Sequence, residues 1–107
     1  MGFVVNLNNQ MIYAYKETRI PGRLLRHLDK MEQDMQNGIN LGGQWVESPS
    51  ELQKHQYVAL VLFDSLQTNN SNLVNITSAY LLDRNKSLSQ INISQHEDKF
   101  ALNLISS

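Results

Sequence analysis

The sequence predicts an α+β fold in which two β-hairpins form an antiparallel sheet and three helices, lying between the hairpins in sequence, pack on one face of it. Three observations support this prediction. Apolar residues alternate near both ends of the chain, recur at steps of three and four in the middle, and are separated by turn-forming residues. The predicted element order is ββαααββ. Because two halves of a 107-residue chain would each be too small to sustain a core, residues 1–107 are predicted to be a single domain.

The first hairpin is predicted over residues 3–15. Asn8 and Asn9 form its turn, since asparagine tolerates the positive φ that a two-residue turn requires. Leu7 then lies opposite Gln10. The face that we expect to meet the core carries Phe3, Val5, Leu7, Ile12 and Ala14.

The first helix is predicted to follow Pro21 and Gly22. Its apolar residues recur at helical spacing and include Leu24, Leu28, Met31 and Met35. Asn37 and Gly38 end the helix, because glycine accepts the left-handed conformation found there. Residues 39–47 contain two adjacent glycines and are expected to form a packed loop.

A second helix is predicted from Ser48 to about Gln67. Ser48 serves as the N-cap, Pro49 occupies the first turn and Glu51 completes a capping box. The alternative is a buried strand through residues 57–63, which has suitable residue types but lacks a nearby turn.

A third helix is predicted after an asparagine-rich turn, and a second hairpin closes the fold. The hairpin covers residues 88–105, with Ser94 paired to Lys99 across a four-residue loop. This register places Ile93 opposite Phe100 and leaves one apolar face.

Composition excludes several classes of function. The chain has no cysteine, so it has no disulfide, no thiolate metal site and no cysteine nucleophile. Its N-terminus lacks the features of a secretion signal, and its longest apolar run, residues 57–63, is too short to span a bilayer. We therefore expect a cytoplasmic protein without a membrane partner.

Sequence motifs for catalysis or cofactor binding are absent. Neither phosphate-binding glycine motif occurs, and no serine lies in a nucleophile motif. The histidines, His27, His55 and His96, are too far apart in sequence for a metal-binding pair, and we interpret them as solvated or boundary residues. The sequence therefore predicts no catalytic residue, no cofactor and no metal.

A basic ridge is the least ordinary feature of the sequence. Arg19, Arg23, Arg26 and Lys30 follow steps of four, three and four, which aligns them on one helix face. The ridge is a candidate for phosphate contact, although an ordinary solvated face is favoured because the net charge is −1. Trp45, the only tryptophan, is a second candidate partner-binding residue, although a core position is favoured.

The leading functional hypothesis is a non-enzymatic interaction or regulatory module that self-associates. Leu60 and Val61 lie off the apolar stripe of the second helix and, with Tyr57, form a patch that a second copy would bury. We expect a homodimer at micromolar concentration. The alternative is a protein that binds nucleic acid or another anionic partner through the basic ridge, and the third hypothesis is an enzyme whose site is assembled from distant residues.

Overall fold

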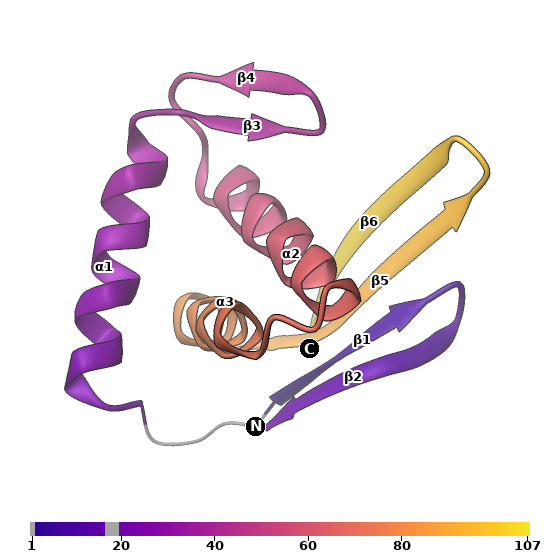
Figure 1. The fold of residues 1–107 in the computed structure, drawn as a ribbon, viewed down its shortest axis with the longest axis horizontal. Coiled ribbons are helices and arrows are strands. Elements are labelled where there is room, and N and C mark those ends of the chain that lie inside the picture. The colour runs from indigo at the N-terminus through magenta and orange to yellow at the C-terminus, as the bar shows by residue number, and fades with distance from the viewer. Residues whose placement is uncertain (1, 17–19) are drawn as a thin grey trace. The chain divides into compact units, whose positions relative to one another are not determined.

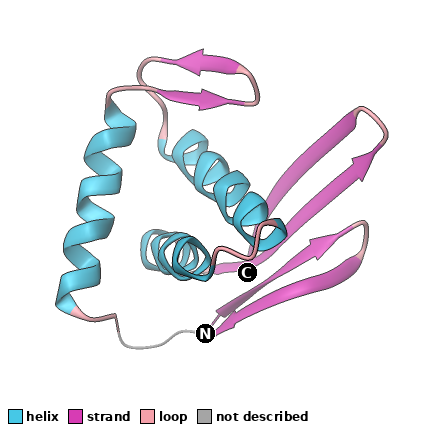
Figure 2. Cartoon of the chain, viewed as in Figure 1, coloured by secondary structure: helices cyan, strands magenta, loops and turns pink. Residues whose placement is uncertain are grey.

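The computed structural model describes residues 2–16 and 20–107 (Figure 1). The chain divides into two compact units, which we describe separately. The sheet unit comprises Met1–Thr18 and Leu81–Ser107, and the helical unit comprises Arg19–Tyr80. Three helices lie between two pairs of strands in the chain, so the predicted α+β class and the order ββαααββ are confirmed (Figure 2).

The sheet unit contains a mixed four-stranded sheet. Its strands β1 (Gly2–Leu7), β2 (Gln10–Lys16), β5 (Leu88–His96) and β6 (Lys99–Ser106) are arranged in the order β2-β1-β5-β6. Both hairpins are antiparallel as predicted, but β1 and β5 pair in parallel, so the prediction of a wholly antiparallel sheet is wrong. A parallel pair needs a long crossover connection, and the helical segment between β2 and β5 supplies it.

The β1–β2 hairpin closes at Asn8 and Asn9, with φ of 50° and 67°, and Leu7 pairs with Gln10 as predicted. A β-bulge then shifts the register: Val5 pairs with Tyr13, which leaves Ile12 as the extra residue. Because of this extra residue, the β2 side chains beyond the bulge lie on the opposite face of the sheet from the one that a regular register would give them. Ile12 is therefore 42% exposed, and the prediction that Ile12 and Ala14 face the core is wrong.

The β5–β6 hairpin has a two-residue turn, and His96 pairs with Lys99. The predicted pairing of Ser94 with Lys99 is wrong by two residues. Because side-chain orientation repeats every two residues, the apolar face is preserved, and Ile93 now lies opposite Leu102. The buried residues of the sheet unit are Phe3, Val5, Leu81, Leu82, Leu88, Ile91 and Ile93.

The helical unit begins with α1 (Gly22–Gln36), which ends at Asn37 and Gly38 as predicted. The next segment is not a loop, as predicted, but a short hairpin of β3 (Ile39–Leu41) and β4 (Gln44–Val46). Gly42 and Gly43 form its turn with φ of 61° and 89°, a conformation that glycine adopts without steric cost.

The second helix, α2 (Glu51–Gln67), confirms the predicted helix and excludes the alternative strand. Its N-cap is Ser50 rather than Ser48, because the capping box joins Ser50 to Gln53. The backbone N–H of Gln53 donates to Ser50 Oγ at 3.2 Å, and the backbone N–H of Ser50 donates to Gln53 Oε1 at 2.9 Å. The predicted Ser48–Glu51 box is therefore wrong by two residues, although its type is correct.

The third helix, α3 (Ser71–Arg84), is also present as predicted. Its residues up to Tyr80 belong to the helical unit, and those from Leu81 onward belong to the sheet unit. Among the described helices, none combines the length and the apolar character that a bilayer span requires.

Candidate functional site

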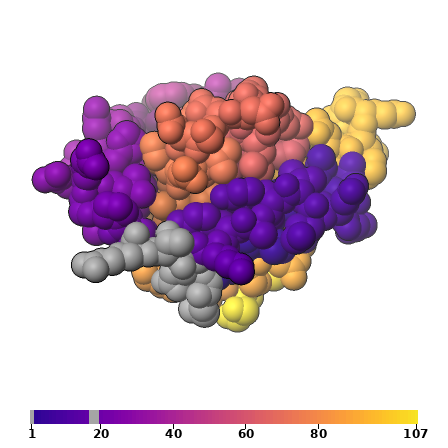
Figure 3. Space-filling model, turned by 60° about the horizontal axis from the view of Figure 1, so that its bottom comes forward, coloured from indigo at the N-terminus to yellow at the C-terminus, as the bar shows by residue number. Residues whose placement is uncertain are grey.

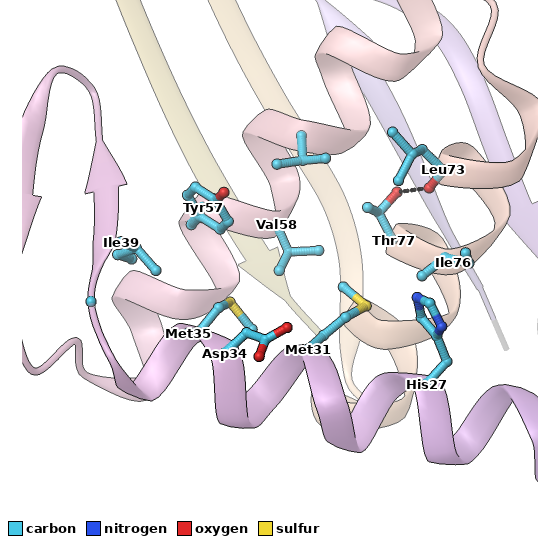
Figure 4. Close-up of a pocket in the computed structure, with 12 residues that line it drawn as sticks. His27, Met31, Asp34, Met35, Ile39, Tyr57, Val58, Leu73, Ile76 and Thr77 are labelled. Carbon is cyan, nitrogen blue, oxygen red and sulfur yellow. Dashed lines mark hydrogen bonds between the residues drawn. The ribbon is translucent and has the colours of Figure 1, made fainter.

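A groove in the helical unit is the candidate functional site. Its cavity has a volume of about 270 Å³, and all three helices and β3 contribute to its walls. Side chains from these elements converge on the same space in Figure 4. We call it the helical groove; it is lined by His27, Met31, Asp34, Met35, Gly38, Ile39, Tyr57, Val58, Val61, Leu73, Ile76 and Thr77.

Helix α1 forms one wall through a helical stripe. His27, Met31 and Asp34 follow steps of four and three, so their side chains project from one face. Met35 adds a buried thioether at the end of this stripe. The sequence predicts Met31 and Met35 as part of the apolar stripe of this helix, and the structure places both in the lining of the groove.

Helix α2 forms the second wall and contains the predicted self-association patch. Tyr57 and Val61 line the groove, together with the buried Val58. Leu60 is half-buried and does not line the groove. The structure therefore brings two of the three patch residues to the groove, where they face side chains of α1 and α3.

Helix α3 completes the groove with Leu73, Ile76 and Thr77. Thr77 donates its hydroxyl hydrogen to the Leu73 carbonyl at 2.6 Å, as the dashed line in Figure 4 shows. This bond satisfies the hydroxyl within the helix, so the wall there remains largely apolar. In the space-filling view α1, in purple, and α3, in orange, adjoin one another (Figure 3).

The groove also presents a charge. The exposed carboxylate of Asp34 forms no ion pair with any residue in the described part of the chain. A largely apolar recess with a carboxylate that has no ion-pair partner among the described residues favours an apolar ligand that carries a positive charge beside its apolar part.

Trp45 lies beside the groove and is not a core residue, so the favoured interpretation of this residue is wrong. It is 64% exposed on β4. Its ring lies against Gly38, where an added Cβ atom would be 2.7 Å from Trp45 Cε2. Gly38 also lines the groove, so the glycine lets a large aromatic surface approach the groove margin.

The basic ridge is solvated where it is described. Arg23, Arg26 and Lys30 are all exposed on α1, and none pairs with a described carboxylate. Arg19 lies outside the described residues. The structure thus brings three of the four predicted basic residues onto one helix, and none of the three lines the helical groove.

A buried polar network joins the three helices that surround the groove. Lys54 Nζ lies 2.9 Å from Glu32 Oε2, and Tyr80 donates its hydroxyl hydrogen to Glu32 Oε1 at 2.9 Å. The hydrogen bond to Glu32 raises the pKa of Lys54 above its usual value, although burial opposes that rise. The ammonium group is therefore charged at neutral pH and unsuited to act as a nucleophile.

Our sequence reasoning missed this network, although a signal was present. Lys54 lies on the same helix face as Val58 and Leu62, at steps of four, and is buried with them. A lysine on an apolar stripe indicates a buried ion pair, because an unpaired buried charge is costly.

The described residues contain no group of three or more histidine, cysteine, aspartate or glutamate side chains that could hold a metal ion. His27 lies on α1, His55 on α2 and His96 on β5. Comparison of the chain with protein-family models, curated proteins and solved structures gives no significant match.

Proposed function

We propose that the protein is a non-enzymatic interaction module that binds a short apolar segment of a partner protein in the helical groove. The observation that carries this proposal is an open recess with largely apolar walls from three helices and one carboxylate, Asp34, that forms no ion pair with a described residue. Sites of this kind hold a ligand through burial of apolar surface and orient it through a few polar groups.

The dimensions of the groove set the size of the segment. An engineered cavity of about 150 Å³ holds one benzene molecule. The helical groove, at about 270 Å³, therefore has room for one large or two medium apolar side chains. From His27 to Asp34 the rise along α1 is about 10 Å, which corresponds to roughly three residues of extended peptide.

The groove walls indicate the chemistry of the segment. Met31 and Met35 have flexible thioether side chains that adapt to differently shaped apolar groups. Asp34 favours an arginine or lysine next to the apolar anchors. Trp45, beside Gly38, offers an aromatic surface on which an adjacent side chain can pack.

Titration with a capped pentapeptide, acetyl-Ala-Leu-Arg-Leu-Ala amide, tests the proposal. Its two leucines project from one side of an extended chain into the groove, and its arginine, on the opposite side, supplies the positive charge at the solvent-exposed margin of the groove, where Asp34 lies. We expect the ¹³C-methyl NMR signals of Met31 and Met35 to shift with a Kd of about 1 mM. This affinity is weak because the free energy gained by burying two leucine side chains only slightly exceeds the entropic cost of association.

Matched variants and peptides distinguish groove binding from general stickiness. Val61→Phe fills the groove and should abolish the shifts, whereas Leu52→Phe, at a site that is 57% exposed on the same helix, should leave them unchanged. A peptide with serine in place of both leucines should not bind, and one with glutamate in place of arginine should bind more weakly. Equal shifts in both variants would refute the proposal.

A second candidate function is contact with an anionic partner through Arg23, Arg26 and Lys30. It is favoured by the exposure of all three and by the lack of described ion pairs. If this surface binds nucleic acid, a gel-shift assay should detect a complex with a 20-base-pair DNA duplex or with single-stranded RNA. The affinity of that complex should fall steeply as the salt concentration rises, and the double variant Arg23→Glu, Arg26→Glu should not form it. No shift at low salt would exclude such nucleic-acid binding.

A further inference from the structure

Strand β6, eight residues long, lies at one end of the four-stranded sheet, and its outer edge pairs with no other described strand. Its only charged residue is Lys99, at its first position, and it contains no proline. Phe100 on one side and Ile105 on the other are 44% and 39% exposed. Strand edges in soluble proteins are usually protected by charge, proline or a bulge, so a bare edge of this length is a surface for strand pairing.

The turn of the hairpin determines which backbone groups face outward. A two-residue turn closes on a hydrogen-bonded pair, here His96 and Lys99. Hydrogen-bonded positions then alternate along the strand, so Lys99, Ala101 and Asn103 bond to β5. The N–H and C=O groups of Leu102 and Leu104 consequently point away from the sheet, toward the side on which another strand can pair.

A row of asparagines crosses the sheet and stops at this edge. Asn6 of β1 lies opposite Asn92 of β5, which lies opposite Asn103 of β6. Asn6 donates from Nδ2 to Asn92 Oδ1 at 2.8 Å. The exposed Asn103 amide forms no hydrogen bond with a described residue, so the last amide of the row retains its donors and acceptor.

We propose that two copies of the chain pair through β6, antiparallel, with Asn103 opposite the partner subunit's Asn103. Leu102 then exchanges backbone hydrogen bonds with the partner subunit's Leu104, and Ala101 lies beside the partner subunit's Ile105. Asn103 occupies a non-hydrogen-bonded position, where opposed side chains are closest, so the two amides can bond and continue the asparagine row into the partner. The product is a continuous eight-stranded sheet.

This register is favoured over its neighbours by side-chain matching. It pairs Leu102 with the partner subunit's Leu104 and Ala101 with the partner subunit's Ile105, places the two amides together and keeps Lys99 at the outer end. A shift of two residues toward the turn would place Lys99 opposite the partner subunit's Ile105 and Ala101 opposite the partner subunit's Asn103. That shift would bury an amide against a methyl group and remove the amide pair. The central asparagine therefore specifies the register.

The opposite edge of the sheet is less suited to this role. β2 contains the bulge at Ile12, which twists the strand and interrupts its ladder, and Lys16 ends it. Self-association through β6 uses the sheet unit alone, whereas the sequence predicted a homodimer through Tyr57, Leu60 and Val61 of the helical unit. The β6 proposal is independent of ligand binding in the helical groove.

Cysteine cross-linking tests the pairing directly, because the chain contains no other cysteine. Opposed residues at a non-hydrogen-bonded position have the Cα separation that a disulfide requires. Under oxidised glutathione, Asn103→Cys should form a covalent dimer at least ten times faster than Ala101→Cys, whose two copies are several residues apart in the proposed register. Equal rates would indicate random collision and overturn the register.

A charge exchange at the same position tests association without a covalent bond. Asn103→Asp and Asn103→Lys should each be monomeric by light scattering on a sizing column, because like charges would face each other, and their mixture should form a heterodimer. Asn9→Asp, the same chemical change at an exposed turn, should dimerise like the original chain. A monomeric mass near 12 kDa for the unmodified protein at 0.5 mM, or two variants that still dimerise alone, would overturn the proposal.

Discussion

Removing one partner from the Lys54–Glu32 ion pair should destabilise the helical unit strongly. The side chains of Lys54 and Glu32 are only 7% and 19% exposed, and their charged atoms are 2.9 Å apart. Lys54→Met keeps most of the aliphatic stem and deletes the ammonium group. Breaking a buried pair costs about 3–5 kcal/mol. The lower end, about 3 kcal/mol, is expected here because Glu32 retains the hydrogen bond from Tyr80.

The second single variant and the double variant separate the charge from the packing. Glu32→Gln keeps an acceptor for Tyr80, and Lys54 retains Glu51 at 3.4 Å, so about 2 kcal/mol should be lost. Combined with Lys54→Met, Glu32→Gln removes the carboxylate charge that has lost the Lys54 ammonium group. The double variant should therefore be more stable than the sum of the two single losses predicts, by about 1–3 kcal/mol. Urea unfolding followed by circular dichroism measures all four proteins.

The pH dependence provides a further check with a defined sign. The pKa of Lys54 is raised above its usual value of 10.5, mainly by the hydrogen bond to Glu32, so the folded chain holds this proton more tightly than the unfolded chain. The stabilisation is therefore complete below pH 10.5 and is lost as the pH rises through the folded pKa. The stability difference between the original chain and Lys54→Met should be constant from pH 6 to 9 and shrink above 10.5. Single losses that simply add, or a difference unaffected by high pH, would refute this reasoning.

Two further substitutions test local structure. Ser50→Ala should cost about 1 kcal/mol because it removes the N-cap of α2, whereas Ser48→Ala should change stability by less than about 0.5 kcal/mol; urea unfolding checks both, and the reverse order would restore the cap predicted from the sequence. Gly38→Ala should displace the Trp45 ring and change its fluorescence, whereas Gly42→Ala, which also has a positive φ but has open space around it, should leave the emission unchanged. Equal emission changes would show that backbone strain, not ring contact, is responsible.

Local signals in the sequence were sufficient for most elements. The Asn8-Asn9 turn, the Asn37-Gly38 helix end and the three helices follow from short-range preferences of backbone and side chain. The position of the α2 cap was missed because two overlapping capping signals lie two residues apart. The local sequence could not distinguish the two capping signals, because each has a serine followed three residues later by a residue able to complete a capping box.

Features that depend on distant pairing could not be derived in this way. The bulge at Ile12 and the parallel pairing of β1 with β5 are set by how strands match across the sheet. The helical groove requires the relative placement of three helices, so sequence reasoning found Tyr57 and Val61 as a patch without finding the recess. Trp45 was assigned to the core because the Gly38 surface that accepts its ring could not be anticipated from the loop sequence.

Binding of an apolar segment in the helical groove is the central claim, and methyl NOE contacts test it most directly. In a complex with the acetyl-Ala-Leu-Arg-Leu-Ala amide peptide, the leucine methyl groups should show intermolecular NOEs to the methyl groups of Met31 and Met35, which line the groove. Met11, which is 61% exposed in the sheet unit, is an internal control and should show none. NOEs to Met11 without NOEs to Met31 or Met35 would place the peptide outside the groove and contradict the claim.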